Sequence, residues 1–116
     1  GELTVLVKVK PGVPSWVTLG TGVVGIRIPD SKYVQTLVAK VGKPLLLTSA
    51  NKSGEPTTRF FEEVVNVFGD ELKAVVKGEC ESLIATTIVD LSKDNELSLV
   101  REGPIPFETI KRVWEE

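Results

Sequence analysis

The side chains alternate most clearly in one stretch, Gly22-Val23-Val24-Gly25-Ile26-Arg27-Ile28-Pro29-Asp30. Successive side chains of a strand point to opposite faces, so residues 23–28 are predicted to form a strand with one wholly apolar face. The other face holds Val23, Gly25 and Arg27. Because Pro29 cannot continue the hydrogen-bonding pattern, the strand is expected to end there.

An amphipathic helix is predicted directly after this strand. Ser31 can cap its first turn, apolar residues recur at helical spacing through Val41, and Gly42 supplies a stop, so the helix is expected over 31–41. Further strands are predicted over 5–10, 45–48, 74–76, 87–90 and 97–100, and further helices over 15–19 (one turn), 59–68 and 107–114. Strands interleaved with helices indicate an α/β fold with helices packed on a central sheet.

The composition restricts the chemistry. The chain has 116 residues, of which 41% are hydrophobic and 26% charged, and a single domain over residues 1–116 is expected. It contains no His, which excludes a Ser-His-Asp triad and a His-ligated metal. The single Cys excludes an internal disulfide and suits the reducing cytoplasm, where we expect the protein. No apolar run is long enough to span a bilayer, so no membrane association is expected.

A polar loop is the first candidate for ligand binding. Small and polar residues follow the apolar run 45–47, in the order Thr48-Ser49-Ala50-Asn51-Lys52-Ser53-Gly54. Ligands of α/β sheets bind beyond the carboxyl ends of strands, and small side chains let an anion approach backbone N–H groups. The alternative is a hydrophilic turn that its own Ser and Asn side chains cap.

Three further positions are candidates. Arg27 lies beside Gly25, whose missing side chain leaves a clearing for a carboxylate or phosphate; the alternative is a surface ion pair. Thr86 enters a predicted strand, where threonine is also simply a good strand former. Arg101 follows a strand, two residues before Gly103, and is either a phosphate clamp or a solvated strand end.

Five ordered segments resemble the motifs of one family. They are Gly1-Glu2-Leu3-Thr4, Gly22 to Asp30, Thr48-Ser49-Ala50-Asn51-Lys52-Ser53-Gly54-Glu55-Pro56, Gly78-Glu79-Cys80 with Thr86-Thr87-Ile88-Val89-Asp90, and Arg101-Glu102-Gly103. Together they are similar to the YrdC-like family, the threonylcarbamoyl-AMP synthases, and the third segment is the most specific of them. Leu83 stands where the family usually has Gly, and Thr86 where it has Ser. The family's domain begins upstream of Gly1, so the resemblance implies the larger C-terminal part of a YrdC-like domain. Its twisted mixed sheet would be incomplete at the N-terminus.

The resemblance also implies a reaction. L-threonine, bicarbonate and ATP would give threonylcarbamoyl-AMP and pyrophosphate, for the threonylcarbamoyladenosine modification of tRNA. Such a site positions anions and neutralises charge, so it needs no catalytic side chain and no metal held by the protein; Mg2+ would arrive with ATP. The implied site residues are Arg27, Ser49 and Thr86 for threonine, and Val23, Asn51, Arg59 and Arg101 for ATP.

Two alternatives of other classes are considered. One is a nucleotide- or RNA-binding module without catalysis, but a net charge of −2 makes direct tRNA binding unexpected. The other is an interaction surface, in which a second copy or another chain completes the sheet, so that a dimer would form. Other tRNA-modification proteins are implied partners in the pathway. Because the family's phosphate-binding Lys and Arg lie upstream, the 116 residues alone are expected to release no pyrophosphate.

Overall fold

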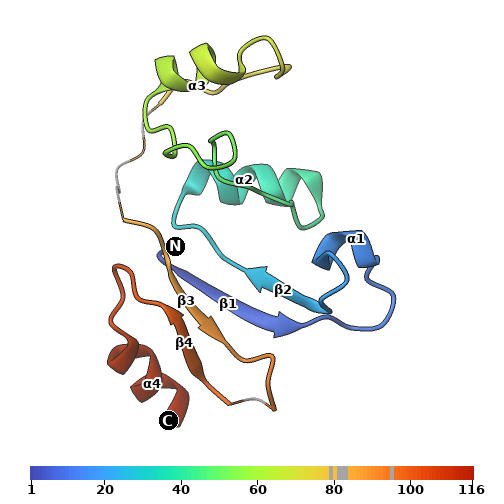
Figure 1. The fold of residues 1–116 in the computed structure, drawn as a ribbon, viewed down its shortest axis with the longest axis vertical. Helices are drawn as coiled ribbons and strands as arrows, with labels where there is room; N and C mark the ends of the chain where they lie inside the picture. Colours follow the sequence, from blue (N-terminus) through green and yellow to red (C-terminus); the bar gives the residue numbers. More distant parts are fainter. Residues whose placement is uncertain (79, 81–83, 95) are drawn as a thin grey trace. The chain divides into compact units, whose positions relative to one another are not determined.

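The fold is known from a computed structural model, which describes residues 1–78, 80, 84–94 and 96–116 (Figure 1). The chain divides into two compact units. The first consists of Gly1–Lys43 and Ile84–Glu116, and the second is Pro44–Leu83. Leu83, one of the two positions that depart from the family pattern, lies outside the described residues.

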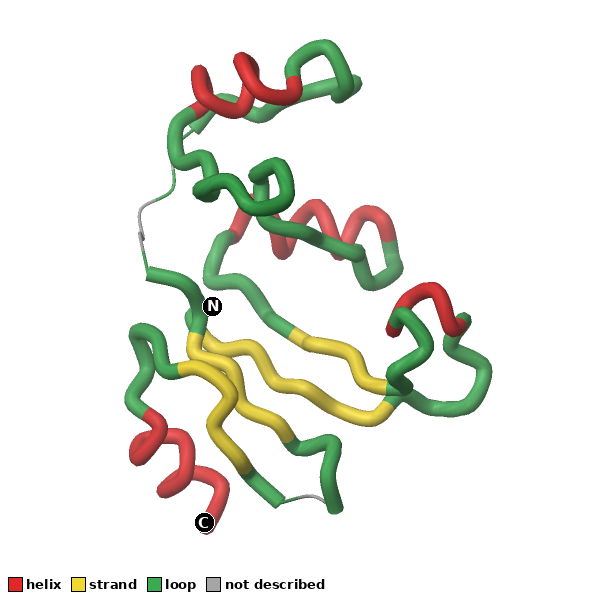
Figure 2. The backbone as a smooth tube through the Cα atoms, in the orientation of Figure 1, coloured by secondary structure: helices red, strands yellow, loops and turns green. Residues whose placement is uncertain are grey.

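A four-stranded mixed sheet forms the centre of the first unit (Figure 2). Its strands are β1 (Leu3–Lys8), β2 (Val23–Ile26), β3 (Thr87–Asp90) and β4 (Ser98–Arg101), in the order β2-β1-β3-β4. β1 pairs antiparallel with β2 and parallel with β3, and β3 pairs antiparallel with β4. The α/β class and the mixed sheet expected from the sequence are thereby confirmed.

The register of the strands sorts the side chains into two faces. Residues that are Cα partners across a sheet share a face. The printed partners place nine residues on one face, here called the polar face: Thr4, Leu6, Lys8, Val23, Gly25, Ile88, Asp90, Ser98 and Arg101. The opposite, apolar face carries Leu3, Val5, Val7, Val24, Ile26, Thr87, Val89 and Leu99. Arg27 falls on the polar face when the alternation of β2 is continued by one residue.

The most deeply buried residues lie on β3. Thr87 has no exposed surface, and Val89 is only 1% exposed. The Thr87 hydroxyl accepts hydrogen bonds from the backbone N–H groups of Gly103 (2.9 Å) and Ile105 (3.1 Å) and donates one to the Ile105 carbonyl (2.7 Å). A side chain at Gly103 would overlap the Ala85 carbonyl oxygen. The segment after β4 is therefore fixed against the apolar face by one buried hydroxyl.

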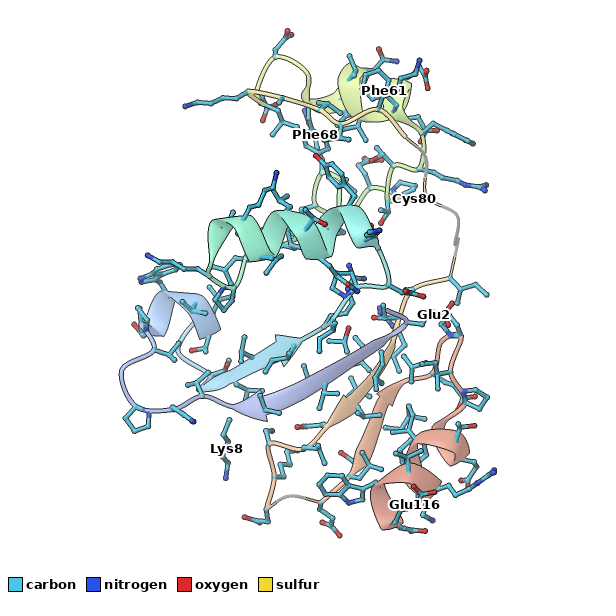
Figure 3. All side chains as sticks on the ribbon, turned by 180° about the vertical axis from the view of Figure 1, so that it is seen from behind. Glu2, Lys8, Phe61, Phe68, Cys80 and Glu116 are labelled. Atoms are coloured by element: carbon cyan, nitrogen blue, oxygen red, sulfur yellow. The ribbon has the colours of Figure 1, made fainter. Side chains whose placement is uncertain are left out.

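Four helices accompany the sheet and the second unit. They are α1 (Ser15–Thr18), α2 (Lys32–Val41), α3 (Phe61–Phe68) and α4 (Phe107–Glu115). In α2 the Ser31 hydroxyl accepts a hydrogen bond from the N–H of Val34, and Gly42 ends the helix with φ of 70°. The cap and the stop predicted from the sequence are thus confirmed. Figure 3 labels Phe61 and Phe68 at the two ends of α3. No helix of the described part of the chain is long and apolar enough to cross a membrane.

Two predicted strands are wrong. Neither residues 45–48 nor residues 74–76 form a strand, although the backbone is non-helical at both places. An apolar run becomes a strand only where a second strand satisfies its backbone groups, and no sheet pairing is found at either place. Leu46 and Leu47 accordingly remain 64% and 68% exposed. The other boundaries moved by no more than two residues, and α3 begins at Phe61 instead of Arg59.

Thr87→Val tests the anchor on the apolar face. The substitution keeps the branched shape but removes the hydroxyl, which leaves two part-buried N–H groups and a carbonyl without their partner. We expect the free energy of unfolding to fall by about 3 kcal/mol in urea denaturation. The control is Thr36→Val, which removes an exposed hydroxyl that bonds only the Lys32 carbonyl and is expected to cost less than about 0.5 kcal/mol. Equal effects of the two substitutions would contradict the role of the anchor.

Candidate functional site

Thr86 and Arg101 form a hydrogen-bonded pair at the entry to β3. The Nε and Nη2 atoms of Arg101 both donate to the Thr86 carbonyl oxygen, at 3.1 and 3.0 Å. Nη2 also lies 3.5 Å from the Thr86 hydroxyl. The same hydroxyl is 3.0 Å from the hydroxyl of Thr4 on β1. The structure thus brings together two residues that the sequence assigned to different ligands, and adds the hydroxyl of Thr4 from the segment at the start of the chain.

Arg27 lies on the same face of the sheet. Continuing the β1–β2 register by one pair places it beside Thr4. Its side chain is exposed and, among the described residues, makes no hydrogen bond or ion pair. The surface ion pair considered as the alternative is therefore not observed in the described part. A guanidinium without a partner in the described part of the chain, on the face that also carries two hydroxyls, is suited to binding a carboxylate.

Gly25 leaves less room than the sequence suggested. A Cβ atom built on Gly25 would lie 3.2 Å from the Thr4 methyl carbon and 3.3 Å from a Leu6 methyl carbon. The two β1 side chains therefore border the expected clearing on one side. The glycine itself is exposed, so the clearing is open to solvent.

Val23 lies on the polar face at the far end of β2, opposite Lys8. It is half-buried, and both its backbone N–H and its carbonyl interact with the Thr21 hydroxyl, at 3.2 and 3.3 Å. Arg27 is four positions further along the extended chain, which corresponds to about 13 Å. Val23 thus shares a face with the other site residues of the first unit but does not adjoin them.

The polar loop of the second unit is held by its own hydrogen bonds. The Asn51 amide nitrogen donates to the carbonyls of Lys52 (3.1 Å) and Glu55 (3.0 Å). The backbone N–H and the hydroxyl of Thr58 both donate to the Ala50 carbonyl, at 2.9 and 2.6 Å. Asn51 thus caps its own loop, as the alternative of a hydrophilic turn predicted. Ser49 is exposed, and its hydroxyl has no partner in the described part of the chain.

Arg59 is fixed at the start of α3. Its Nε atom donates to the Cys80 carbonyl at 3.1 Å, and its own carbonyl accepts from the Cys80 N–H at 3.1 Å. Its guanidinium carbon lies 5.2 Å from the centre of the Phe60 ring. The Glu63 carboxylate accepts from the N–H groups of Arg59 (2.7 Å) and Phe60 (3.1 Å). These two hydrogen bonds lower the pKa of Glu63 from its ordinary value of 4.5.

The groups of the two units are suited to binding anions. The first unit supplies two guanidiniums and the Thr86 hydroxyl on one sheet face, and the second supplies Ser49, Asn51 and Arg59. No group of three or more His, Cys, Asp or Glu side chains that could hold a metal lies among the residues that the structure describes. That both sets line one hollow stays a prediction from the sequence.

The comparisons with known proteins agree with these motifs. A family model named Sua5_yciO_yrdC and described as "Telomere recombination" matches residues 1–103. A putative threonylcarbamoyl-AMP synthase of Methanocaldococcus jannaschii is 34% identical over 113 residues, which are 97% of this chain and 52% of that protein. A threonylcarbamoyl-AMP synthase of Vibrio cholerae is 38% identical over 101 residues, 87% of this chain and 53% of that protein. The chain thus spans about half the length of these curated relatives.

Solved structures show the same fold. The crystal structure of P. abyssi Sua5 complexed with L-threonine matches with a TM-score of 0.86 and 28% identity, covering 97% of this chain and 33% of that one. The crystal structure of E. coli YciO matches with a TM-score of 0.79 and 27% identity. The match covers 91% of this chain and 52% of the YciO chain.

Asn51→Asp tests whether the Asn51 amide holds the polar loop. A carboxylate would face the Lys52 and Glu55 carbonyls without a hydrogen to donate, so the loop should open. We expect faster amide hydrogen exchange at Glu55 and Thr58. In Ser49→Ala, which removes a hydroxyl without a partner in the described part, exchange should stay unchanged. Equal exchange rates in Asn51→Asp and the unmodified protein would contradict this role.

Glu63 should show a lowered pKa in solution. The folded chain favours the carboxylate form of Glu63. Its contribution to the free energy of unfolding is therefore fully present above pH 4.5 and is lost as the pH falls through the lowered pKa. The amide resonances of Arg59 and Phe60, followed by NMR, should titrate with a midpoint below 4.5. Glu63→Gln should abolish that titration, whereas Glu62→Gln, on the same turn, should leave it in place. A midpoint at or above 4.5 would contradict the assignment.

Proposed function

Because the chain belongs to the Sua5/YciO/YrdC family, we propose that it supplies part of the active site of a threonylcarbamoyl-AMP synthase. The proposed reaction joins L-threonine, bicarbonate and ATP and yields threonylcarbamoyl-AMP, pyrophosphate and water. The observation that carries the proposal is the polar face of the sheet. There, Arg27 has no partner among the described residues and follows β2 on the face that also carries the hydrogen-bonded hydroxyls of Thr4 and Thr86.

L-threonine is proposed to bind at this end of the sheet. Its carboxylate would pair with the Arg27 guanidinium, which can donate two parallel hydrogen bonds. Thr86 would contact the amino acid through its hydroxyl, and Ser49 would contribute from the polar loop. The exposure of Arg27 and of Ser49 supports this assignment, because both side chains have donors to spare.

ATP is proposed to bind through Arg101, Arg59, Asn51 and the backbone near Val23. Arg101 uses Nε and Nη2 on the Thr86 carbonyl, and a guanidinium has five N–H donors, so Nη1 remains for a phosphate. The Asn51 amide nitrogen is occupied within its loop, which favours contact through the loop backbone over contact through the amide. Mg2+ is proposed to arrive as the ATP complex.

The proposed chemistry requires positioning more than proton transfer by a side chain. The threonine amine forms a bond to the carbon of bicarbonate, with loss of water, and gives a carbamate. A carbamate oxygen then attacks the α-phosphorus of ATP, and the bond to the bridging oxygen breaks as pyrophosphate leaves. Negative charge gathers on the phosphates in this step, so fixed guanidiniums can stabilise it.

The remaining expectations concern partners and location. The product is a mixed anhydride, so we propose that a tRNA-modifying protein receives its threonylcarbamoyl group. The predicted pairing of a second copy would use the free edge of β2, where Ile26 is 51% exposed. A cytoplasmic location stays a prediction from the lone cysteine.

Arg27→Ala tests the proposed threonine site. In the protein at its native length, calorimetric titration should show L-threonine affinity lowered by about tenfold or more, since a hydrogen bond to a charged group contributes about 1.5–3 kcal/mol. Pyrophosphate release at low threonine concentration should fall with it. Arg112→Ala, which removes an exposed arginine of α4, is the matched control and should change neither quantity. Unchanged threonine affinity in Arg27→Ala would refute the site.

A further inference from the structure

Thr4 makes a hydrogen bond between residues distant in the sequence. Its hydroxyl oxygen lies 3.0 Å from that of Thr86, 82 residues further along the chain, and both side chains are half-buried. The contact follows from the parallel pairing of β1 with β3, in which Thr4 is the partner of Ile88. Thr86 is one of the residues proposed to contact L-threonine, whereas Thr4 has no proposed contact with it.

The strands on the two sides of Thr4 orient its side chain. Toward β2, the Thr4 methyl carbon lies close to Gly25, since a Cβ atom built there would be 3.2 Å from it. Toward β3, the Thr4 hydroxyl meets Thr86. A β-branched side chain has few χ1 rotamers, so placing the methyl beside Gly25 also directs the hydroxyl.

The Thr86 hydroxyl has limited hydrogen-bonding capacity. A hydroxyl donates one hydrogen bond and accepts up to two. Thr4 takes part in one of these, and Arg101 Nη2, at 3.5 Å, approaches a second. One hydrogen bond of the Thr86 hydroxyl then remains for a ligand, and its direction is set by the other two.

We propose that Thr4 is a positioning residue of the threonine site, which fixes the direction of the Thr86 hydroxyl without touching the substrate. The inference rests on the proposed function. It predicts that removing the Thr4 hydroxyl weakens threonine binding only while Thr86 has a hydroxyl to be directed.

A double-mutant cycle on L-threonine affinity tests the proposal. The variants are Thr4→Val, Thr86→Val and the double variant, titrated by calorimetry in the protein at its native length. We expect Thr4→Val to weaken binding about fivefold, the size of one hydrogen bond. In the Thr86→Val background the same change should have no further effect. Thr4→Ser, which keeps the hydroxyl but loses the methyl that directs it, should bind more tightly than Thr4→Val and less tightly than the unmodified protein. A purely structural role for Thr4 would instead give effects that add.

Gly25→Ala provides a second perturbation from the neighbouring strand, which keeps the test valid should Thr4→Val fail to fold. The new methyl group would press on the Thr4 methyl carbon. The affinity for L-threonine should therefore fall when Gly25→Ala is made in the unmodified protein, and should not fall further when it is made in the Thr86→Val variant. Additive effects in the cycle, or normal binding by Thr4→Val while Thr86→Val binds weakly, would overturn the inference alone. If the unmodified protein gives no heat with L-threonine, the proposed function fails and the inference falls with it.

Discussion

The parallel pairing of β1 with β3 is the constraint on which the rest of the structure depends. Parallel neighbours cannot be joined by a tight turn, so the chain must make a long excursion between them. Here the excursion includes β2, α2 and the whole second unit. The same pairing brings Thr4 to Thr86 and sets Thr87 on the opposite face, where the segment after β4 is anchored. One set of backbone hydrogen bonds therefore positions both the candidate site and the most buried part of the sheet.

The elements predicted well are those with complete local signals. Alternation and a proline define β2, while a serine cap and a terminal glycine define α2, and both appear within two residues of the expected bounds. The runs 45–48 and 74–76 are equally apolar but lack a partner strand, and sequence periodicity does not contain that information. A strand is a property of a pair of segments, whereas a helix satisfies its backbone within itself.

The same distinction applies to the site. Arg27, Thr86 and Arg101 could be chosen from the sequence because the motifs around them are local, but their common face follows from the register alone. Thr4 belongs to the first of the segments that resemble the family, but only its pairing in the sheet reveals that its hydroxyl meets a second one. The hydrogen bonds that engage Asn51 and Arg59 are likewise features of folded loops, which residue type does not specify.

Thr86 and Thr87 are adjacent in sequence yet serve opposite sides of the sheet, the first toward Thr4 and Arg101 and the second toward Gly103 and Ile105. Inserting or deleting one residue beside them would exchange the two hydroxyls, because side chains alternate with a period of two. A substitution at either position disturbs one side, while a change of length disturbs both at once. This part of the chain should accordingly tolerate evolutionary replacement of residues far better than insertion or deletion.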